Sequence, residues 1–140
     1  MNDLIRRIAV REGIRPIYAT TGHATTSVVV DATGYSRALW VVQVGDMDAL
    51  AVLEMEVQES ATRAGTYTDV TSAALTDIAS TAGKNKPYFI DHAVTYNKPY
   101  LKMAGTCGTA RATVSAVCIL YGKNGIVRDA YSSAGEIVDL

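Results

Sequence analysis

The chain has 140 residues, of which 49% are apolar and 19% charged, and its 13 basic and 14 acidic side chains leave a formal net charge of -1. A chain of this length fits one domain and can bury a core without disulfide or metal staples. Its near neutrality excludes the global electrostatic attraction that usually accompanies nucleic-acid binding. No apolar run reaches the roughly 20 residues of a membrane-spanning helix, and charged residues interrupt the segment where a secretion signal would need an apolar core. We therefore expect synthesis in a cytoplasm, no nucleic-acid or membrane partner, and some surface buried between subunits.

The first 22 residues lack the sustained alternation of a strand. Gly13 and Pro16 stop any amphipathic helix that begins at Leu4. We expect residues 1–22 to form an extended N-terminal arm, which at about 3.3 Å per residue is long enough to reach a neighbouring molecule. The alternative is an ordinary first strand or short helix that folds against its own domain.

Two β-rich segments follow the arm. The β-branched run from Thr25 to Val30 predicts one strand, and Tyr35 to Val44 predicts a second. Both faces of the second strand are largely apolar, so we expect it to be central or covered on both sides. Trp40 in this strand should anchor the core, with a partner for its ring N–H. Gly45 to Asp48 predicts a turn.

The segment from Val52 to Val70 carries the clearest pattern in the chain. Leu53, Met55 and Val57 alternate with Glu54, Glu56 and Gln58, and a turn through Gly65 leads into a return strand. A period of two places apolar side chains on one face and polar ones on the other. The pattern predicts an antiparallel hairpin with one buried and one solvated face.

The remaining segments predict further strands. We expect a loop over residues 71–83, with a short helical turn as the alternative, then strands at Tyr88–His92 and Tyr100–Ala104, each preceded by a proline. The sequence Gly-Thr-Cys-Gly at residues 105–108 predicts a turn, and Ala110–Tyr121 predicts the longest strand, apolar on both faces in its second half.

These elements predict an all-β fold: an antiparallel, jelly-roll-like β-sandwich of seven or eight strands. No alternating helices are present to make parallel crossovers. The expected organisation is an arm at residues 1–22, a sandwich domain at 23–122 and a flexible C-terminal tail at 123–140.

Side chains capable of catalysis are few. We expect Cys107 and Cys118 to be reduced thiols, with Cys118 in the core. The imidazoles are His23 and His92, and Asp91 points to the opposite face of its strand from His92, so the two do not form a dyad. Glu54 and Glu56 are expected on the wet side of a sheet, and Asp46 with Asp48 in an Asx-type turn. The sequence therefore predicts no enzyme, no cofactor and no metal site.

Three stretches carry a resemblance to known proteins: Val57–Ser60, Gly65–Val70 and Lys98–Met103, followed by the long strand to Tyr121. Over about Val28 to Gly122 the chain resembles small head-associated structural proteins of tailed bacteriophages, several of which are decoration or cement proteins. The resemblance implies a β-sandwich or jelly roll that binds the outside of an assembled shell, usually as an oligomer. The hairpin from Val57 to Val70 also looks like that of discoidin-type carbohydrate-binding modules.

The expected function is therefore capsid decoration on the virion surface. The resemblance implies the major capsid protein and further copies of the chain as partners, with a trimer expected before a dimer. The alternatives are a carbohydrate-binding module on the virion surface, with exposed tyrosines as its platform, and a tail or connector protein. The candidate contact residues are Ile5, Ile8, Ile14, Ile17, Tyr18, Tyr96 and Tyr100.

Overall fold

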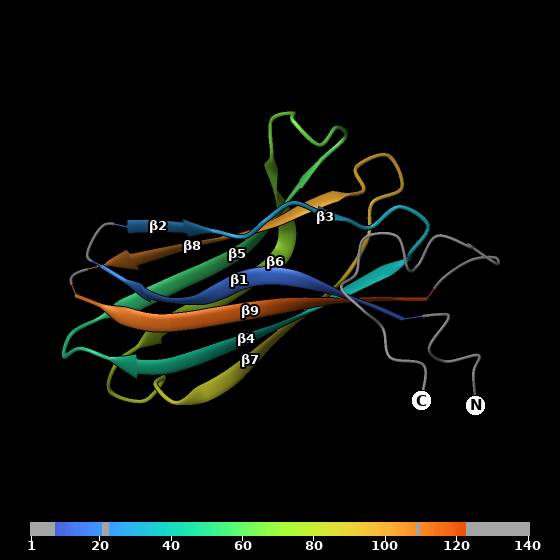
Figure 1. Cartoon of the computed structure of the whole chain (residues 1–140). Coiled ribbons are helices and arrows are strands. Elements are labelled where there is room, and N and C mark those ends of the chain that lie inside the picture. The colour runs from blue at the N-terminus through green and yellow to red at the C-terminus, as the bar shows by residue number, and fades with distance from the viewer. Residues whose placement is uncertain (1–7, 21–22, 109, 123–140) are drawn as a thin grey trace, which may run out of the picture.

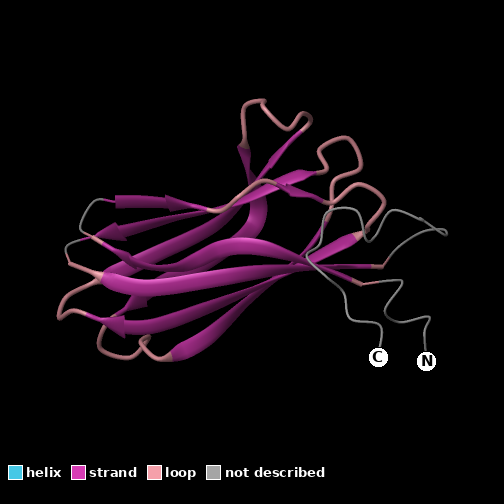
Figure 2. Cartoon of the chain, viewed as in Figure 1, coloured by secondary structure: helices cyan, strands magenta, loops and turns pink. Residues whose placement is uncertain are grey.

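The computed structural model describes residues 8–20, 23–108 and 110–122. This part of the chain contains nine strands and no helix (Figures 1 and 2). The strands are β1 (Ala9–Ala19), β2 (His23–Thr26), β3 (Val30–Asp31), β4 (Arg37–Met47), β5 (Val52–Ser60), β6 (Thr68–Ala79), β7 (Lys86–Ala93), β8 (Tyr100–Gly108) and β9 (Ala112–Tyr121).

The strands form two sheets in which every pairing is antiparallel. Sheet A has the order β1-β9-β4-β7, and sheet B has the order β2-β8-β5-β6, with β3 also paired to β8. Figure 1 shows the two layers, with the β3–β4, β5–β6 and β7–β8 loops gathered toward one end. The predicted all-β antiparallel sandwich is confirmed.

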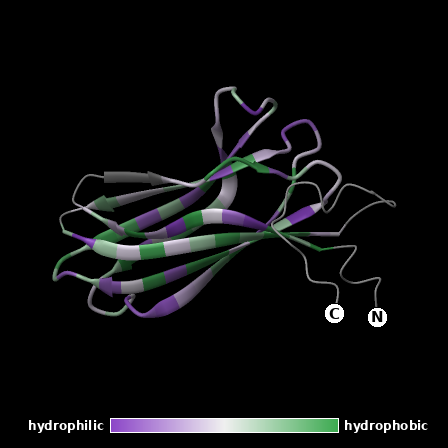
Figure 3. Cartoon of the chain, in the orientation of Figure 1, coloured by the Kyte–Doolittle hydropathy of each residue, from purple (hydrophilic) through white to green (hydrophobic). Residues whose placement is uncertain are grey.

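The core lies between the sheets and is built by the alternation that the sequence displays. On β5, Leu53, Met55 and Val57 are at most 1% exposed, whereas Glu54 between them is exposed. Figure 3 shows such bands of hydrophobic and hydrophilic residues along the strands. Burial of each large apolar side chain contributes about 1.5–3 kcal/mol before conformational entropy is counted. The largest of these side chains come from both sheets and are Trp40, Leu53, Met55, Leu101, Met103 and Leu120.

Trp40 on β4 is fully buried, which confirms its predicted place in the core. The expected partner for its ring does not appear, because the indole N–H has no hydrogen-bond partner within the described residues.

The N-terminal segment differs from the expected arm over residues 9–19, which form β1 at the edge of sheet A. The alternative of an ordinary first strand therefore holds there, while residues 1–7 lie outside the described residues. Gly13 and Pro16, which interrupt the alternation, lie where β1 shifts its register against β9. The β1–β9 register shifts between Glu12 and Ile14 and again between Ile14 and Ile17. A side chain on Gly13 would collide with the backbone carbonyl of Ala116, so the first bulge requires glycine.

Three further expectations need correction. Residues 71–79, predicted as loop, belong to β6, because register shifts against β5 let Ala73 and Ile78 both face the core despite their irregular spacing. The predicted turn at residues 105–108 is the end of β8, where Gly105 pairs with Met55. The turn predicted from Gly45 begins later, because β4 continues to Met47. The predicted tail at 123–140 lies outside the described residues.

Candidate functional site

The outer face of sheet A carries a contiguous apolar surface. Val10, Leu39, Val41, Phe89, Val117 and Ile119, here called the sheet A face, occupy strand positions between residues that point into the core. Leu39 pairs with Ile119, and Val10 pairs with the other side of Ile119. In the next row, Val41 lies between Val117 and Phe89.

These side chains remain accessible to solvent. Phe89 is 59% exposed, Val10 55% and Val117 42%, and the other three are half-buried by their neighbours. Nothing in the described part of the chain lies over them as a third layer (Figure 1). A sheet buried on one side normally presents polar residues to water on the other, so its apolar outer surface makes the sheet A face a candidate interaction surface.

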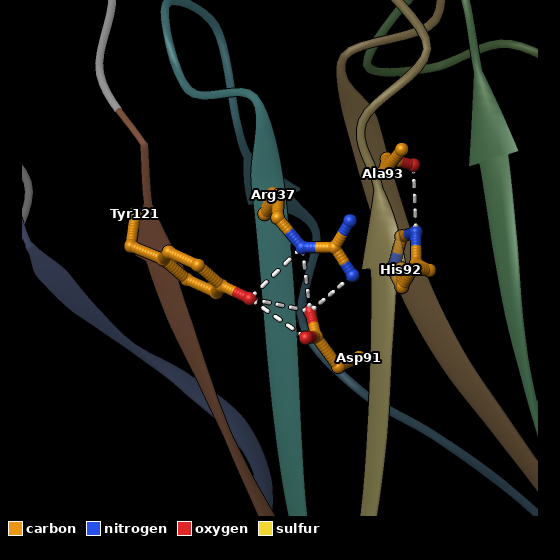
Figure 4. Close-up of polar contacts among 5 residues, drawn as sticks. All are labelled: Arg37, Asp91, His92, Ala93 and Tyr121. Atoms are coloured by element: carbon orange, nitrogen blue, oxygen red, sulfur yellow. Dashed lines mark hydrogen bonds and ion pairs between the residues drawn. The ribbon is translucent and has the colours of Figure 1, made fainter.

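A hydrogen-bonded cluster borders one end of the sheet A face (Figure 4). Arg37 Nη2 lies 3.0 Å from Asp91 Oδ1, and the Tyr121 hydroxyl donates to both carboxylate oxygens of Asp91 at 2.7 Å. Arg37 Nε also donates to the Tyr121 hydroxyl at 2.9 Å. Burial acts to raise the pKa of Asp91, but hydrogen bonds from Arg37 and Tyr121 outweigh it and hold the pKa below its usual value.

The outer face of sheet B has the opposite character. On β5, Glu54 and Glu56 point away from the core, as predicted, and Asp77 of β6 joins them around a shallow hollow of about 220 Å³. Asp69 on β6 is also exposed, and it accepts a hydrogen bond of 2.9 Å from Gln58. Among the described residues, Lys102 of β8 adds an ammonium group to this face, and its Nζ lies 4.1 Å from the centre of the Tyr67 ring. This face therefore carries a clear excess of negative charge.

A second apolar feature lies at one end of the sandwich, between the β3–β4 and β7–β8 loops. A hollow of about 360 Å³ is lined by Tyr35, Val94, Pro99 and neighbouring residues of both loops. Tyr96 stands at this hollow with 99% of its surface exposed. Backbone hydrogen bonds from Ala32 to Pro99 and from Val94 to Ser36 hold the two loops together.

The residues predicted for intermolecular contact are scattered over the molecule. Ile14 is 5% exposed and belongs to the core, so it is not available on the surface. Tyr96 is the most exposed residue of the set, whereas Tyr100 and Ile8 are half-buried. Ile5 lies outside the described residues.

Ile17 and Tyr18 are also surface residues, at 36% and 48% exposed, near the end of β1. The Tyr18 hydroxyl donates to Asp48 at 3.2 Å, and the Arg111 guanidinium lies 5.0 Å from the centre of the Tyr18 ring. Tyr18, Asp48 and Arg111 therefore form a polar cluster, and this end of β1 does not extend the sheet A face.

Sequence reasoning missed the sheet A face, although its signal was present. The sequence of β4 and that of the second half of β9 are apolar on both sides. This pattern predicts that β4 is central in its sheet or covered on both faces. The structure confirms that β4 is central, because it lies between β9 and β7 within sheet A, and β9 is an inner strand as well. Within the described residues, no segment covers the outer face of β4.

The polar groups of the interior do not form a catalytic pair. His92 points into the core at 8% exposed, while Asp91 points outward, as predicted (Figure 4). His92 Nδ1 lies 3.0 Å from the carbonyl oxygen of Ala93, and its Nε2 has no partner within the described residues. Burial lowers the pKa of His92 below its ordinary value. Glu59, also 8% exposed, accepts a bond of 3.1 Å from Lys98 Nζ.

The cysteines and the acidic side chains are the remaining candidates for a reactive or metal-binding site. Cys107 and Cys118 are both buried and free, and burial raises the pKa of Cys118 to about 12. A thiol with that pKa carries almost no thiolate at neutral pH. The described residues contain no group of three or more histidine, cysteine or acidic side chains placed to hold a metal ion. The side chain of His23 lies outside what the structure describes.

None of the described residues belongs to a helix that is long and apolar enough to span a bilayer.

Comparison with known proteins gives structural likenesses only. No family model matches the chain, and no curated protein matches its sequence. The VP2 subviral particle of infectious bursal disease virus is similar with a TM-score of 0.62 and 12% identity over 89% of this chain. The structure of the Gx strain of that virus gives a TM-score of 0.60 and 14% identity, also over 89%. The PBSX exported protein XepA gives a TM-score of 0.58 and 11% identity over 95% of this chain.

The chain spans 34% of the length of each viral protein and 43% of XepA. At such identities the likeness shows the fold and nothing further. The chain is thus an antiparallel β-sandwich similar to domains of a viral capsid protein and of a phage PBSX exported protein.

Proposed function

We propose that this chain is a structural virion protein that binds the outer surface of a bacteriophage capsid and stabilises contacts between capsid subunits. The fold it shares with VP2 and XepA supports a virion role. The motifs at Val57–Ser60 and Lys98–Met103, which resemble head-associated phage proteins, support the decoration role.

The observation that carries the proposal is uncovered apolar surface in two separate places. One is the sheet A face, and the other is the Tyr96 end, here defined as Tyr96 with the hollow between its two loops. A decoration protein needs surface for the shell and surface for its own kind. We assign the shell contact to the Tyr96 end, because loops can adapt to the surface shape of a large partner.

Many symmetry-related copies make such a contact effective. Each copy gains roughly 25 cal/mol per Å² of apolar surface that it buries, before the costs of association are subtracted. Copies that also contact one another raise the effective concentration at neighbouring sites. The proposal requires no chemistry: in the described residues His92 is enclosed in the core, and Asp91 is occupied by Arg37 and Tyr121.

Co-sedimentation with undecorated capsids tests the proposal. The full chain should pellet with the shells and raise the temperature at which they open, and Tyr96→Ala should weaken both effects. Leu50→Ala is the matched control, because Leu50 is 75% exposed in the β4–β5 connection. If the unaltered protein stays in the supernatant and the shells open at the same temperature, the proposal is wrong.

A second function is favoured by the geometry of the Tyr96 end. An exposed tyrosine ring beside a hollow of about 360 Å³ has the size and aromatic lining of a small-ligand site. The chain would then bind carbohydrate on the virion surface. A glycan array followed by titration separates the two functions: saturable sugar binding that Tyr96→Ala or Tyr100→Ala abolishes supports the second, and its absence leaves the first.

A further inference from the structure

The loop that carries Tyr96 is tied to the sandwich through the end of an edge strand. β7 lies at the edge of sheet A, and His92 and Ala93 make its last two pairs with β4. The next residue, Val94, donates a backbone hydrogen bond of 2.9 Å to Ser36. Val94 and Tyr96 also line the hollow of about 360 Å³. The shape of the Tyr96 end therefore depends on how the last residues of β7 are held.

His92 faces the core at this point, with only 8% of its surface exposed. Its Nδ1 lies 3.0 Å from the carbonyl oxygen of Ala93 (Figure 4). Because a carbonyl oxygen only accepts hydrogen bonds, this contact places the ring proton on Nδ1. The neutral ring then has a bare Nε2, which has no partner within the described residues. A second proton has to bind at Nε2, inside the core.

The charged groups around His92 do not compensate for its burial. Glu59 of β5 is buried within electrostatic range of the ring, but Lys98 Nζ lies 3.1 Å from one of its oxygens and offsets its charge. On the outer side of the sheet, Asp91 is paired with Arg37. Burial is the largest influence on the pKa of His92 and lowers it, although the backbone hydrogen bond and the two carboxylates act to raise it.

We propose that protonation of His92 opens the end of β7 and releases the loop that carries Tyr96. A charged imidazole enclosed in the core is unfavourable, and contact with water relieves this cost. An edge strand can expose its last residues without unfolding the rest of its sheet. The hollow loses its shape when the loop leaves, so acid should weaken the shell contact at the Tyr96 end. The inference rests on the proposed function for this last consequence alone.

Amide hydrogen exchange of the full chain tests the opening. The exchange is read by mass spectrometry and corrected for the effect of pH on the intrinsic rate. In the peptide from Tyr88 to Asn97, the population of the open form should rise by up to about tenfold for each pH unit below about 6.5. The rise should end where the folded form also takes up the proton. A peptide from β5 should keep its protection over the same range.

Two variants separate His92 from its neighbour on β7. His92→Gln keeps a polar side chain but removes the titration, so its corrected exchange should not change between about pH 7.5 and 5.5. Asp91→Asn is the matched control, because it removes the adjacent outward-facing group and should leave the response in place. Circular dichroism shows whether both variants keep the strand content of the parent.

A proton titration of the ring gives a second measurement that does not depend on altering His92. His23→Gln leaves His92 as the single histidine of the chain. The ring protons of His92 in this variant should titrate in NMR spectra with a midpoint below about 6.5. A midpoint at or above that value, a parent whose β7 peptide shows no pH response, or a His92→Gln variant that retains the response would overturn the proposal.

Co-sedimentation connects the opening with capsid binding. The parent should bind undecorated shells about tenfold less at about pH 5.5 than at about pH 7.5, whereas His92→Gln should bind equally at both. If the parent binds at neither pH, the proposed function is wrong, and the exchange result still decides the opening. Equal binding by the parent at both pH values would show that the opening does not control the contact.

Discussion

The outer faces of the two sheets are built from the same strand geometry and carry opposite chemistry. Sheet A presents Phe89, Val117 and Val10 to solvent, whereas sheet B presents Glu54, Glu56 and Asp77. Their inner faces are alike, both closely packed with apolar side chains. The difference shows that the inner faces share one chemistry because they build the core, while the outer faces can differ without a change of fold. It also makes the comparison testable, because inside and outside can be altered separately on each sheet.

The largest effect is expected where the two sheets are alike. Leu53→Ala on β5 and Leu120→Ala on β9 both remove side chains that are 0% exposed. Each should lower the free energy of unfolding by about 2–5 kcal/mol, through lost burial and the cavity left behind. Urea denaturation measures the loss. A loss below about 1 kcal/mol for only one of them would show that the two inner faces are not equally packed.

A carboxylate on the core-facing side of sheet B should contribute differently to stability from those on its outer face. Lys98→Met removes the ammonium group 3.1 Å from Glu59, which is 8% exposed and has one oxygen without a partner in the described residues. We expect a loss of about 1–3 kcal/mol in unfolding free energy, because a charged group is left buried and unpaired.

Two matched variants sharpen that experiment. Glu54→Gln on the outer face should change stability by less than about 0.5 kcal/mol. Adding Glu59→Gln to Lys98→Met should recover part of the loss, because the stranded charge is then gone. If the double variant is no more stable than Lys98→Met alone, the burial of Glu59 is not the cause.

His92, which faces the core, and Asp91, which faces outward on the same strand, should affect stability at different pH values. Burial lowers the pKa of His92 in the folded protein, so the unfolded chain binds the proton more readily. Stability should therefore fall as pH drops below the ordinary histidine pKa of about 6.5, with a slope of up to about 1.4 kcal/mol per pH unit.

The outward-facing Asp91 should contribute only at lower pH, because its pKa lies below the usual carboxyl value and its protonation comes later. Urea titrations at a series of pH values measure both stages. His92→Gln should flatten the first stage and leave the second. A variant that retains the full slope between pH about 6.5 and 5 would assign that slope to another group.

The smallest effect is expected on the outer face of sheet B. Glu56→Lys reverses one charge among neighbouring carboxylates and should shift unfolding free energy by no more than about 0.5 kcal/mol. Raising the salt concentration should shrink even that change, since exposed charges are screened. Ultracentrifugation should show the same mass as the parent. A change of mass would mean that the outer face of sheet B carries a contact.

Features that depend only on neighbouring residues could be predicted from the amino-acid sequence. The alternation from Leu53 to Gln58 fixed which side chains of β5 face the core, and adjacency alone placed Asp91 and His92 on opposite faces. The apolar run around Trp40 located a central strand. These inferences succeeded because strand geometry repeats every two residues and needs no knowledge of the partner strand.

The order of the strands within each sheet could not be predicted in this way and is seen only in the folded chain. Ile119 and Leu39 are 80 residues apart along the chain, and their pairing is what joins separate apolar positions into the sheet A face. The bulges in β1 and β6 could not be predicted from the sequence either. An extra residue interrupts the alternation of the strand, and its pairing resumes only against the partner strand. Local pattern specifies the face to which a side chain points, but register between distant strands is set by the packing of the whole core.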